Sequence, residues 1–93
     1  MGYEPIYSIK FKKNVRDLAG KDGKIKDGLT KAIPFILEKP YYKSEKIKGE
    51  DGNLMRKHIC ANNFRIFYYV DEKNKKVTFA MLRPKNKNTY KNL

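Results

Sequence analysis

The segment from Phe64 to Val70 is apolar or aromatic at every position except Arg65. A strand has this composition when both of its faces are covered, because neither set of alternating side chains then meets water. No apolar run in the chain approaches the roughly 20 residues that a membrane span needs. The segment therefore predicts the central strand of a sheet, and the rest of the chain must supply its neighbours.

Two further strand-forming runs flank this segment, at 54–60 and 76–82. Short turns separate the three runs, which predicts a three-stranded antiparallel meander. Apolar and polar residues alternate from Tyr7 to Phe11 and predict a short N-terminal strand. The segment 40–53 is polar and holds two glycines, so we expect a loop there.

Two helices are expected between the first strand and the meander. Residues 12–18 predict the first, with Gly20 placed to cap its end. The second should run from about residue 23 to 38, with Asp22 as its N-cap and Pro34 bending its last turn. Its apolar residues recur with the spacing of one buried stripe, at Ile25, Leu29, Ile33 and Ile36 or Leu37. A tight turn makes the pair an antiparallel hairpin, so the expected fold class is α+β.

The chain has 93 residues, which predicts a single domain over 1–93, and its formal net charge is +12. No acidic residue follows Glu72, whereas seven cations do: Lys73, Lys75, Lys76, Arg83, Lys85, Lys87 and Lys91. Gene composition or adaptation to heat also enriches lysine, but neither explains an acid-free stretch of 21 residues. Such a charge attracts phosphate polymers or acidic proteins.

Cys60 is the only cysteine, so a disulfide within the chain is impossible and a reducing cytoplasm is expected. The first residues lack the charged and apolar regions of a secretion signal. One histidine and one cysteine cannot form a zinc site, and residues 49–52 lack a phosphate-loop pattern. We therefore expect no metal, no cofactor and no membrane partner.

The turn between the second and third strands of the sheet decides which side chains share a face. Residues 62–63, both Asn, are expected to form a two-residue hairpin turn that sets Cys60 opposite Arg65. Six side chains then share one basic, concave face: Arg56, His58, Cys60, Arg65, Phe67 and Tyr69. A three-residue turn would instead move His58 onto the face of Ile66 and break this cluster. The balance of apolar residues favours the shorter turn.

The order strand, two helices, three strands resembles the RelE/ParE toxin superfamily, especially its RelE branch. The resemblance covers nearly the whole chain, and its matching segments are LEKP, KIKGEDG, RKHICANNFRIFYYV and the ending from Arg83 to Tyr90. Its most specific part is the hairpin with Phe64-Arg65 and Phe67-Tyr68. The resemblance implies a metal-independent endoribonuclease that cuts messenger RNA in the ribosomal A site. It also implies a RelB-like antitoxin wrapped around the toxin in a hetero-oligomer.

By position, Arg65 matches the arginine that opens the third strand of the family's sheet. Arg83 lies near the arginine after its fourth strand, and Tyr90 matches a tyrosine near its C-terminus. Arg56 and His58 fall where the RelE branch often has lysines. The histidine, and Pro84 at the end of the last strand, depart from the family pattern and leave the proton-transfer groups open.

RNA is cut when its 2′-hydroxyl is aligned and deprotonated beside a stabilised phosphate, which cations and one or two titrating groups can achieve. We expect Arg65 to bind the phosphate, because a guanidinium binds oxygens in pairs; the alternative is an ordinary surface arginine. His58, with an ordinary pKa of about 6.5, suits a general base or acid; the alternative is a structural histidine on a half-exposed strand. Arg83 and Tyr90 complete the expected catalytic set. Tyr90 would stack on a base or align the phosphate; the alternative is an unstructured terminal tyrosine.

Other residues are expected to bind RNA around this set. Arg56, Lys85 and Lys87 should hold phosphates, although the two lysines could simply solvate a tail. Phe67 and Tyr69 could stack on bases, or could equally pack beneath the antitoxin or the C-terminal segment of the chain. Lys57 points to the opposite face in the preferred register, which indicates a structural role.

Two alternatives belong to other functional classes. A non-catalytic RNA- or ribosome-binding module would need the same basic face without a titrating residue. A ParE-like poison of DNA gyrase would lack the RNA-cutting cluster, and the joint presence of Arg56, His58, Arg65 and Tyr90 argues against it.

Overall fold

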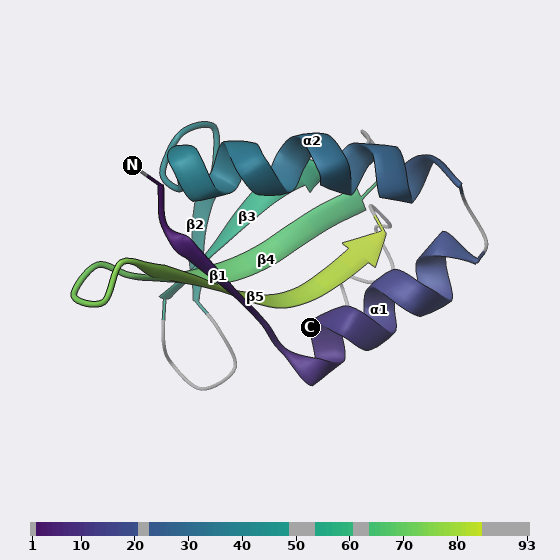
Figure 1. Cartoon of the computed structure of the whole chain (residues 1–93), viewed down its shortest axis with the longest axis horizontal. Helices are drawn as coiled ribbons and strands as arrows, with labels where there is room; N and C mark the ends of the chain where they lie inside the picture. Colours follow the sequence, from purple (N-terminus) through teal and green to yellow (C-terminus); the bar gives the residue numbers. More distant parts are fainter. Residues whose placement is uncertain (1, 21–22, 49–53, 61–63, 85–93) are drawn as a thin grey trace.

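The computed structural model describes residues 2–20, 23–48, 54–60 and 64–84. These residues form an α+β fold with two helices and one five-stranded mixed sheet (Figure 1). The elements are β1 (Glu4–Tyr7), α1 (Ile9–Ala19), α2 (Lys24–Glu38), β2 (Glu45–Lys48), β3 (Leu54–Cys60), β4 (Phe64–Asp71) and β5 (Lys76–Pro84). The strand order is β1-β5-β4-β3-β2, with β1 parallel to β5 and every other pair antiparallel. The predicted fold class is confirmed, and β4 is central as predicted.

The predicted first strand is wrong beyond Tyr7, because α1 begins at Ile9. Ser8 is the N-cap of α1, and its Oγ accepts a hydrogen bond from the Phe11 backbone N–H at 3.0 Å. The same hydroxyl donates to the Ala80 carbonyl of β5 at 2.8 Å. Ser8 thus satisfies a free N–H of the helix and fixes the start of α1 against the sheet.

Helix α2 agrees with its prediction over Lys24–Glu38, and Pro34 lies inside it. Its buried stripe consists of Ile25, Leu29, Ala32 and Ile36, with Ile33 and Leu37 partly buried beside them. The predicted N-cap is wrong: Gly23 occupies that position without a side-chain hydrogen bond, and Asp22 lies outside the described residues.

The segment predicted as a loop contains an additional strand, β2, which pairs with β3 from Glu45–Lys57 to Lys48–Leu54. Its sequence, EKIK, carries charges at three of four positions. This is typical of an edge strand, where charge discourages pairing with other chains. Pairing with β3 stops at Glu45, two residues after Lys43, whose φ of 51° is left-handed.

The sheet has two apolar faces with different covers. Both helices pack on the first face, where Phe11 of α1 and the α2 stripe meet Phe64, Ile66 and Tyr68 of β4. The second apolar cluster is buried at Met55, Phe67 and Met81, and its described members all come from strands. We name these the helix-covered face and the opposite face.

A bulge in β5 changes which of its side chains reach each face. Phe67 pairs with Met81 and Tyr68 with Phe79, so Ala80 is the extra residue of β5. Before the bulge, Val77 and Phe79 lie on the helix-covered face; after it, Met81 lies on the opposite face. The bulge therefore shifts the alternation of side chains by one residue.

The segment between α2 and β2 is fixed by side chains from three parts of the fold. The Tyr68 hydroxyl donates to the Pro40 carbonyl at 2.6 Å, and Arg56 Nε donates to Ser44 Oγ at 2.6 Å. The Tyr41 hydroxyl donates to the Glu72 carboxylate in the β4–β5 turn. Loss of contact with water, and secondly this hydrogen bond, raise the pKa of Tyr41 to about 12. These contacts position the segment beside α2 and β3.

Replacing Tyr68 with Phe should lower the free energy of unfolding by about 1 kcal/mol, because the Pro40 carbonyl then loses the buried hydrogen bond from Tyr68 and keeps only the longer one from Ser44 Oγ, at 3.2 Å. Urea denaturation at pH 7 measures this change. Tyr42→Phe is the matched control, because that ring is 52% exposed, and should change stability by less than about 0.5 kcal/mol. Equal losses in the two variants would contradict the assigned role of Tyr68.

Candidate nucleic-acid interface

The pairing of β3 with β4 decides which charged side chains lie together. Cys60 pairs with Phe64, Ile59 with Arg65 and His58 with Ile66. The predicted pairs, Cys60 with Arg65 and His58 with Phe67, are therefore wrong by one residue. Three residues, not two, lie between the paired residues Cys60 and Phe64. Residues 61–63 themselves lie outside the described part of the chain.

This register breaks the predicted basic cluster, because a shift of one residue exchanges the two faces of a strand. Arg56, His58 and Cys60 lie on the helix-covered face, whereas Arg65 lies on the opposite face. Lys57, predicted to point away from Arg65, lies instead on the same face as Arg65. The predicted common face of arginines and imidazole is therefore wrong.

Three cations meet on the opposite face: Lys57 of β3, Arg65 of β4 and Arg83 of β5. Arg65 and Arg83 are direct cross-strand partners, and Lys57 lies two pairs along the β3–β4 ladder from Arg65, which returns its side chain to the same face. Side chains that face each other across antiparallel strands have Cβ atoms about 5 Å apart. Because like charges at that spacing repel, a bound anion between the two guanidinium groups would stabilise them.

A pocket of about 380 Å³ joins two of these cations. Lys57 and Arg65 both line it, together with Glu45 and the exposed side chain of Ile59. Each of the three cations has a contact within the protein. Lys57 Nζ lies 3.3 Å from Glu45 Oε2, and Arg65 Nη1 donates to the Phe64 carbonyl at 2.9 Å. Arg83 Nε lies 3.2 Å from Met81 Sδ. Arg83 does not line this pocket, but it pairs with Arg65 across β4 and β5. Among the described residues, the pocket and this neighbouring arginine are the arrangement best suited to a phosphate group.

Arg56, predicted to hold phosphate, makes contacts within the protein. Its Nη2 donates to the Ser44 carbonyl at 3.3 Å, and its guanidinium carbon lies 5.0 Å from the centre of the Tyr41 ring. These contacts, and its position on the helix-covered face, separate Arg56 from Arg65 and Arg83.

The two predicted stacking residues differ in exposure. Phe67 is 2% exposed within the second cluster, so its ring has no free face for a base, and its predicted stacking role is wrong. Tyr69 is half-buried at the side of this cluster. Lys85, Lys87 and Tyr90 lie outside the described residues, and their predicted roles stay predictions.

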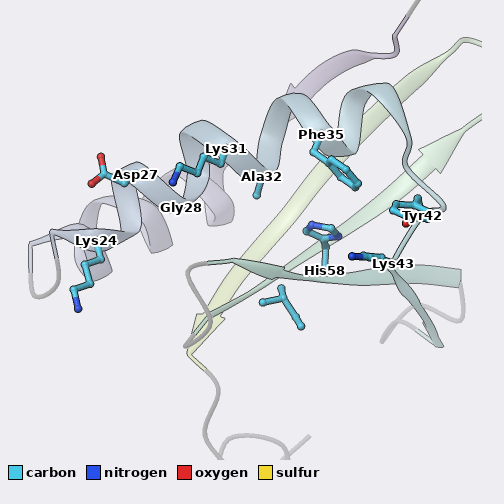
Figure 2. Close-up of a pocket in the computed structure, with 10 residues that line it drawn as sticks. Lys24, Asp27, Gly28, Lys31, Ala32, Phe35, Tyr42, Lys43 and His58 are labelled. Carbon is cyan, nitrogen blue, oxygen red and sulfur yellow. The ribbon is translucent and has the colours of Figure 1, made fainter.

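His58 lies beneath α2, in a second pocket of about 560 Å³ (Figure 2). Its ring centre is 5.6 Å from that of Phe35, and among the described residues no hydrogen-bond partner reaches its buried Nδ1. Loss of contact with water lowers the pKa of His58 below its ordinary value, while a hydrogen bond with the Lys43 backbone acts in the opposite direction. The neutral imidazole is therefore favoured, away from the cations of the opposite face.

Two further features limit the chemistry of the described residues. Burial raises the pKa of the Cys60 thiol to about 11, so it is protonated and a poor nucleophile at neutral pH. No three His, Cys, Asp or Glu side chains within the described ranges are grouped to hold a metal ion.

The described helices include none with the length and apolar character to cross a membrane.

Sequence reasoning missed Lys57 and its partner Glu45. The signal for Lys57 was the length of the turn, because the three-residue alternative places it with Arg65. Glu45 gave no comparable signal, since it belongs to a strand whose composition resembles a loop.

Solved structures share this architecture. The RelBE2 toxin–antitoxin complex of Mycobacterium tuberculosis matches with a TM-score of 0.71 and 11% identity, over 90% of this chain and 99% of that chain. The archaeal RelE–RelB complex of Pyrococcus horikoshii matches with a TM-score of 0.71 and 15% identity, over 94% and 99%. A mutant of the E. coli toxin RelE in the free state matches with a TM-score of 0.59 and 18% identity, over 98% and 93%.

The chain has the RelE-like toxin fold. No family model matches the sequence, and no curated protein matches it. The RelE-like fold is therefore established by structure, and the chemistry of the site depends on this chain's own residues.

The RNA binding expected from the sequence should weaken in a salt-dependent way when a cation of the opposite face is removed. For Lys57→Ala and Arg65→Ala, the slope of log affinity against log salt concentration should become shallower by about 0.7 for each lost contact with single-stranded RNA. Fluorescence anisotropy with a labelled RNA oligonucleotide at several salt concentrations measures this slope. Lys26→Ala, on the exposed side of α2, is the control; an equal change in that variant would argue against a localised RNA site.

His58 should make the protein less stable in mild acid. Because its pKa is lowered on folding, the unfolded chain binds more protons, and the free energy of unfolding should fall as the pH drops from 7 through about 6.5. Urea denaturation at pH 7.5 and pH 5.5 tests this, and His58→Gln should flatten the difference. An unchanged pH dependence in that variant would contradict the assigned environment of His58.

Proposed function

We propose that this protein is the toxin of a type II toxin–antitoxin system, with residues 1–93 as a single domain that cuts messenger RNA on the ribosome. The observation that carries the proposal is the meeting of Lys57, Arg65 and Arg83 on the opposite face of a RelE-like fold. The net charge of +12 suits RNA and ribosomal surfaces, both of which are polyanions. The proposed place of action is the cytoplasm.

The pocket between Lys57 and Arg65 would bind the phosphate at which the RNA is cut. Arg65 and Arg83 would hold its non-bridging oxygens, because guanidinium groups stay charged and bind oxygens in pairs. Charge on these oxygens increases as the 2′-oxygen approaches phosphorus, so both arginines would stabilise the transition state more than the substrate. This is catalysis by positioning and charge.

The proposed cleavage forms a bond between the 2′-oxygen and phosphorus and breaks the bond between phosphorus and the 5′-oxygen. The 2′-hydroxyl loses a proton and the departing 5′-oxygen gains one. The Glu45 carboxylate and the Lys57 ammonium, 3.3 Å apart in the same pocket, are the described groups that could accept and donate these protons. His58 takes no part in this scheme, and Tyr90 stays a prediction as a stacking or aligning group.

The proposed partner is an antitoxin that joins the toxin in a hetero-oligomer. Two of the structural neighbours are complexes of RelE with RelB or of the RelBE type. An acidic antitoxin would complement the charge of this chain, and its removal would release the toxin onto ribosomes.

A non-catalytic RNA- or ribosome-binding module is the second candidate. The position of His58 favours it, because the only histidine of the chain lies away from the three cations. Such a module would use the same cations for affinity and leave the RNA intact.

Induction of the protein in bacterial cells, followed by primer extension on a translated message, separates these functions. The toxin should stop growth and produce cuts inside coding regions, and the cuts should vanish when translation of that message is blocked. Arg65→Ala should reduce cleavage by about 100-fold or more, since it removes a group that stabilises developing charge. His58→Gln is the matched control and should still cleave.

Other outcomes would assign other functions. Growth arrest with intact messages and ribosome-bound protein would favour the binding module. Intact messages with accumulated DNA breaks would favour a ParE-like gyrase poison. Loss of cleavage in His58→Gln, with normal folding, would contradict the assignment of the site to the opposite face.

A further inference from the structure

A groove separate from the proposed RNA pocket runs along α2. It is the pocket of about 560 Å³ that contains His58, and its wall on α2 extends from Lys24 to Phe35 (Figure 2). Eleven helical steps of 1.5 Å give this wall a length of roughly 16 Å, the span of several residues of an extended peptide. The other wall is formed by Tyr42, Lys43 and the end of β3.

The groove exposes large apolar side chains to solvent. Phe35 is 36% exposed, Tyr42 52% and Ile59 54%, and all three line the groove. Phe35 contacts the rings of both Tyr42 and His58, with ring centres 5.7 Å and 5.6 Å apart. Exposed apolar groups gathered in one hollow are typical of a surface that binds a partner.

Gly28 is a second indication that the groove is kept open. It lies inside α2 and lines the groove, where any other residue would place a side chain. Glycine inside a helix lowers stability by about 0.5–1 kcal/mol relative to alanine. With Ala32 one turn away, Gly28 leaves a hollow in the middle of the helix wall, with the Lys31 side chain beside it (Figure 2).

The charges around the groove are mostly positive. Lys24, Lys31 and Lys43 line it, against one acidic residue, Asp27. An occupant with negative charge on both sides of an apolar group would therefore match both the rim and the centre.

We infer that this groove binds an acidic peptide segment of the partner antitoxin, with one aliphatic side chain seated against Gly28 and Ala32 and carboxylates facing Lys24, Lys31 and Lys43. That the segment belongs to an antitoxin rests on the proposed function. That it is acidic and carries an aliphatic side chain rests on the geometry and charge of the groove. The groove adjoins the pocket of Lys57 and Arg65 and shares Lys43 and Ile59 with it, but neither Lys57 nor Arg65 lines the groove.

An aliphatic side chain fits this groove better than a nucleobase. The ring of Phe35 already contacts those of Tyr42 and His58, and the exposed Tyr42 ring already has Lys39 Nζ and Lys43 Nζ at 5.7 Å and 5.6 Å from its centre. The central wall is formed by helix surface at Gly28 and Ala32. A base needs an open aromatic face on which to stack, whereas an aliphatic group needs only a hollow of matching size. The groove is also longer than one nucleoside.

The test uses the purified protein and a short fluorescein-labelled peptide with one leucine between two runs of glutamate. Fluorescence anisotropy should show binding, and replacing the leucine of the probe with serine should weaken it by about tenfold or more. Gly28→Leu should fill the groove and also weaken binding about tenfold, with a thermal midpoint no lower than that of the wild type because leucine favours helix.

Charge reversal provides a second, independent variant. Lys31→Glu should weaken binding of the peptide roughly three- to fivefold, since it replaces an attraction with a repulsion. Lys26→Glu is the matched control: it makes the same change of charge on the same helix, at a residue outside the groove, and should change affinity less than about twofold.

Three results would overturn the inference. One is equal binding of the leucine and serine peptides, and another is wild-type affinity in both Gly28→Leu and Lys31→Glu. The third is displacement of the peptide by polyuridylate with the same dependence on Gly28 and Lys31, which would make the groove an RNA site. The peptide assay contains no ribosomes, so a negative result there would leave the proposed messenger RNA cleavage untouched. A negative primer-extension result would likewise leave peptide binding in the groove untouched.

Discussion

The alternation of side chains along β3, β4 and β5 determines what each face of the sheet can do. Pairing of Cys60 with Phe64 brings Lys57 to the face of Arg65, and the bulge at Ala80 brings Arg83 there as well. Without that bulge, Arg83 would follow Val77 and Phe79 onto the helix-covered face, where an unpaired charge would be costly. The same irregularity that keeps the core apolar therefore assembles the cationic site.

The elements with strong patterns could be predicted from the sequence. Helix α2 has a clear buried stripe and β4 an almost continuous apolar run, so packing and local preference agree. The start of α1 could not be predicted by alternation, because Ile9 is 85% exposed on a helix and Phe11 is buried beneath it. There the capping bonds of Ser8 decide the structure. Strand β2 was missed because its charges suit an exposed edge as well as a loop.

The site was harder to predict because both faces of the sheet are apolar. Counting apolar residues favoured the register that buries Ile59, yet the structure leaves Ile59 54% exposed and places His58 beneath α2. Met55, Phe67 and Met81 form a second buried cluster, so the opposite face also accepts large apolar groups. Hydrophobic pattern alone could not separate the two registers, and turn length decided between them.

The two pockets share a boundary, which couples their proposed ligands. Lys43 and Ile59 line both the groove along α2 and the pocket of Lys57 and Arg65. Because Lys43 lines both pockets, carboxylates bound beside it would repel a phosphate in the neighbouring pocket, and this repulsion would weaken as salt shortens the Debye length, about 8 Å at physiological salt. They would lower RNA affinity through repulsion without covering the cations themselves. A partner segment in the groove could thus inhibit the toxin electrostatically, in addition to any contact that it makes with the cationic site.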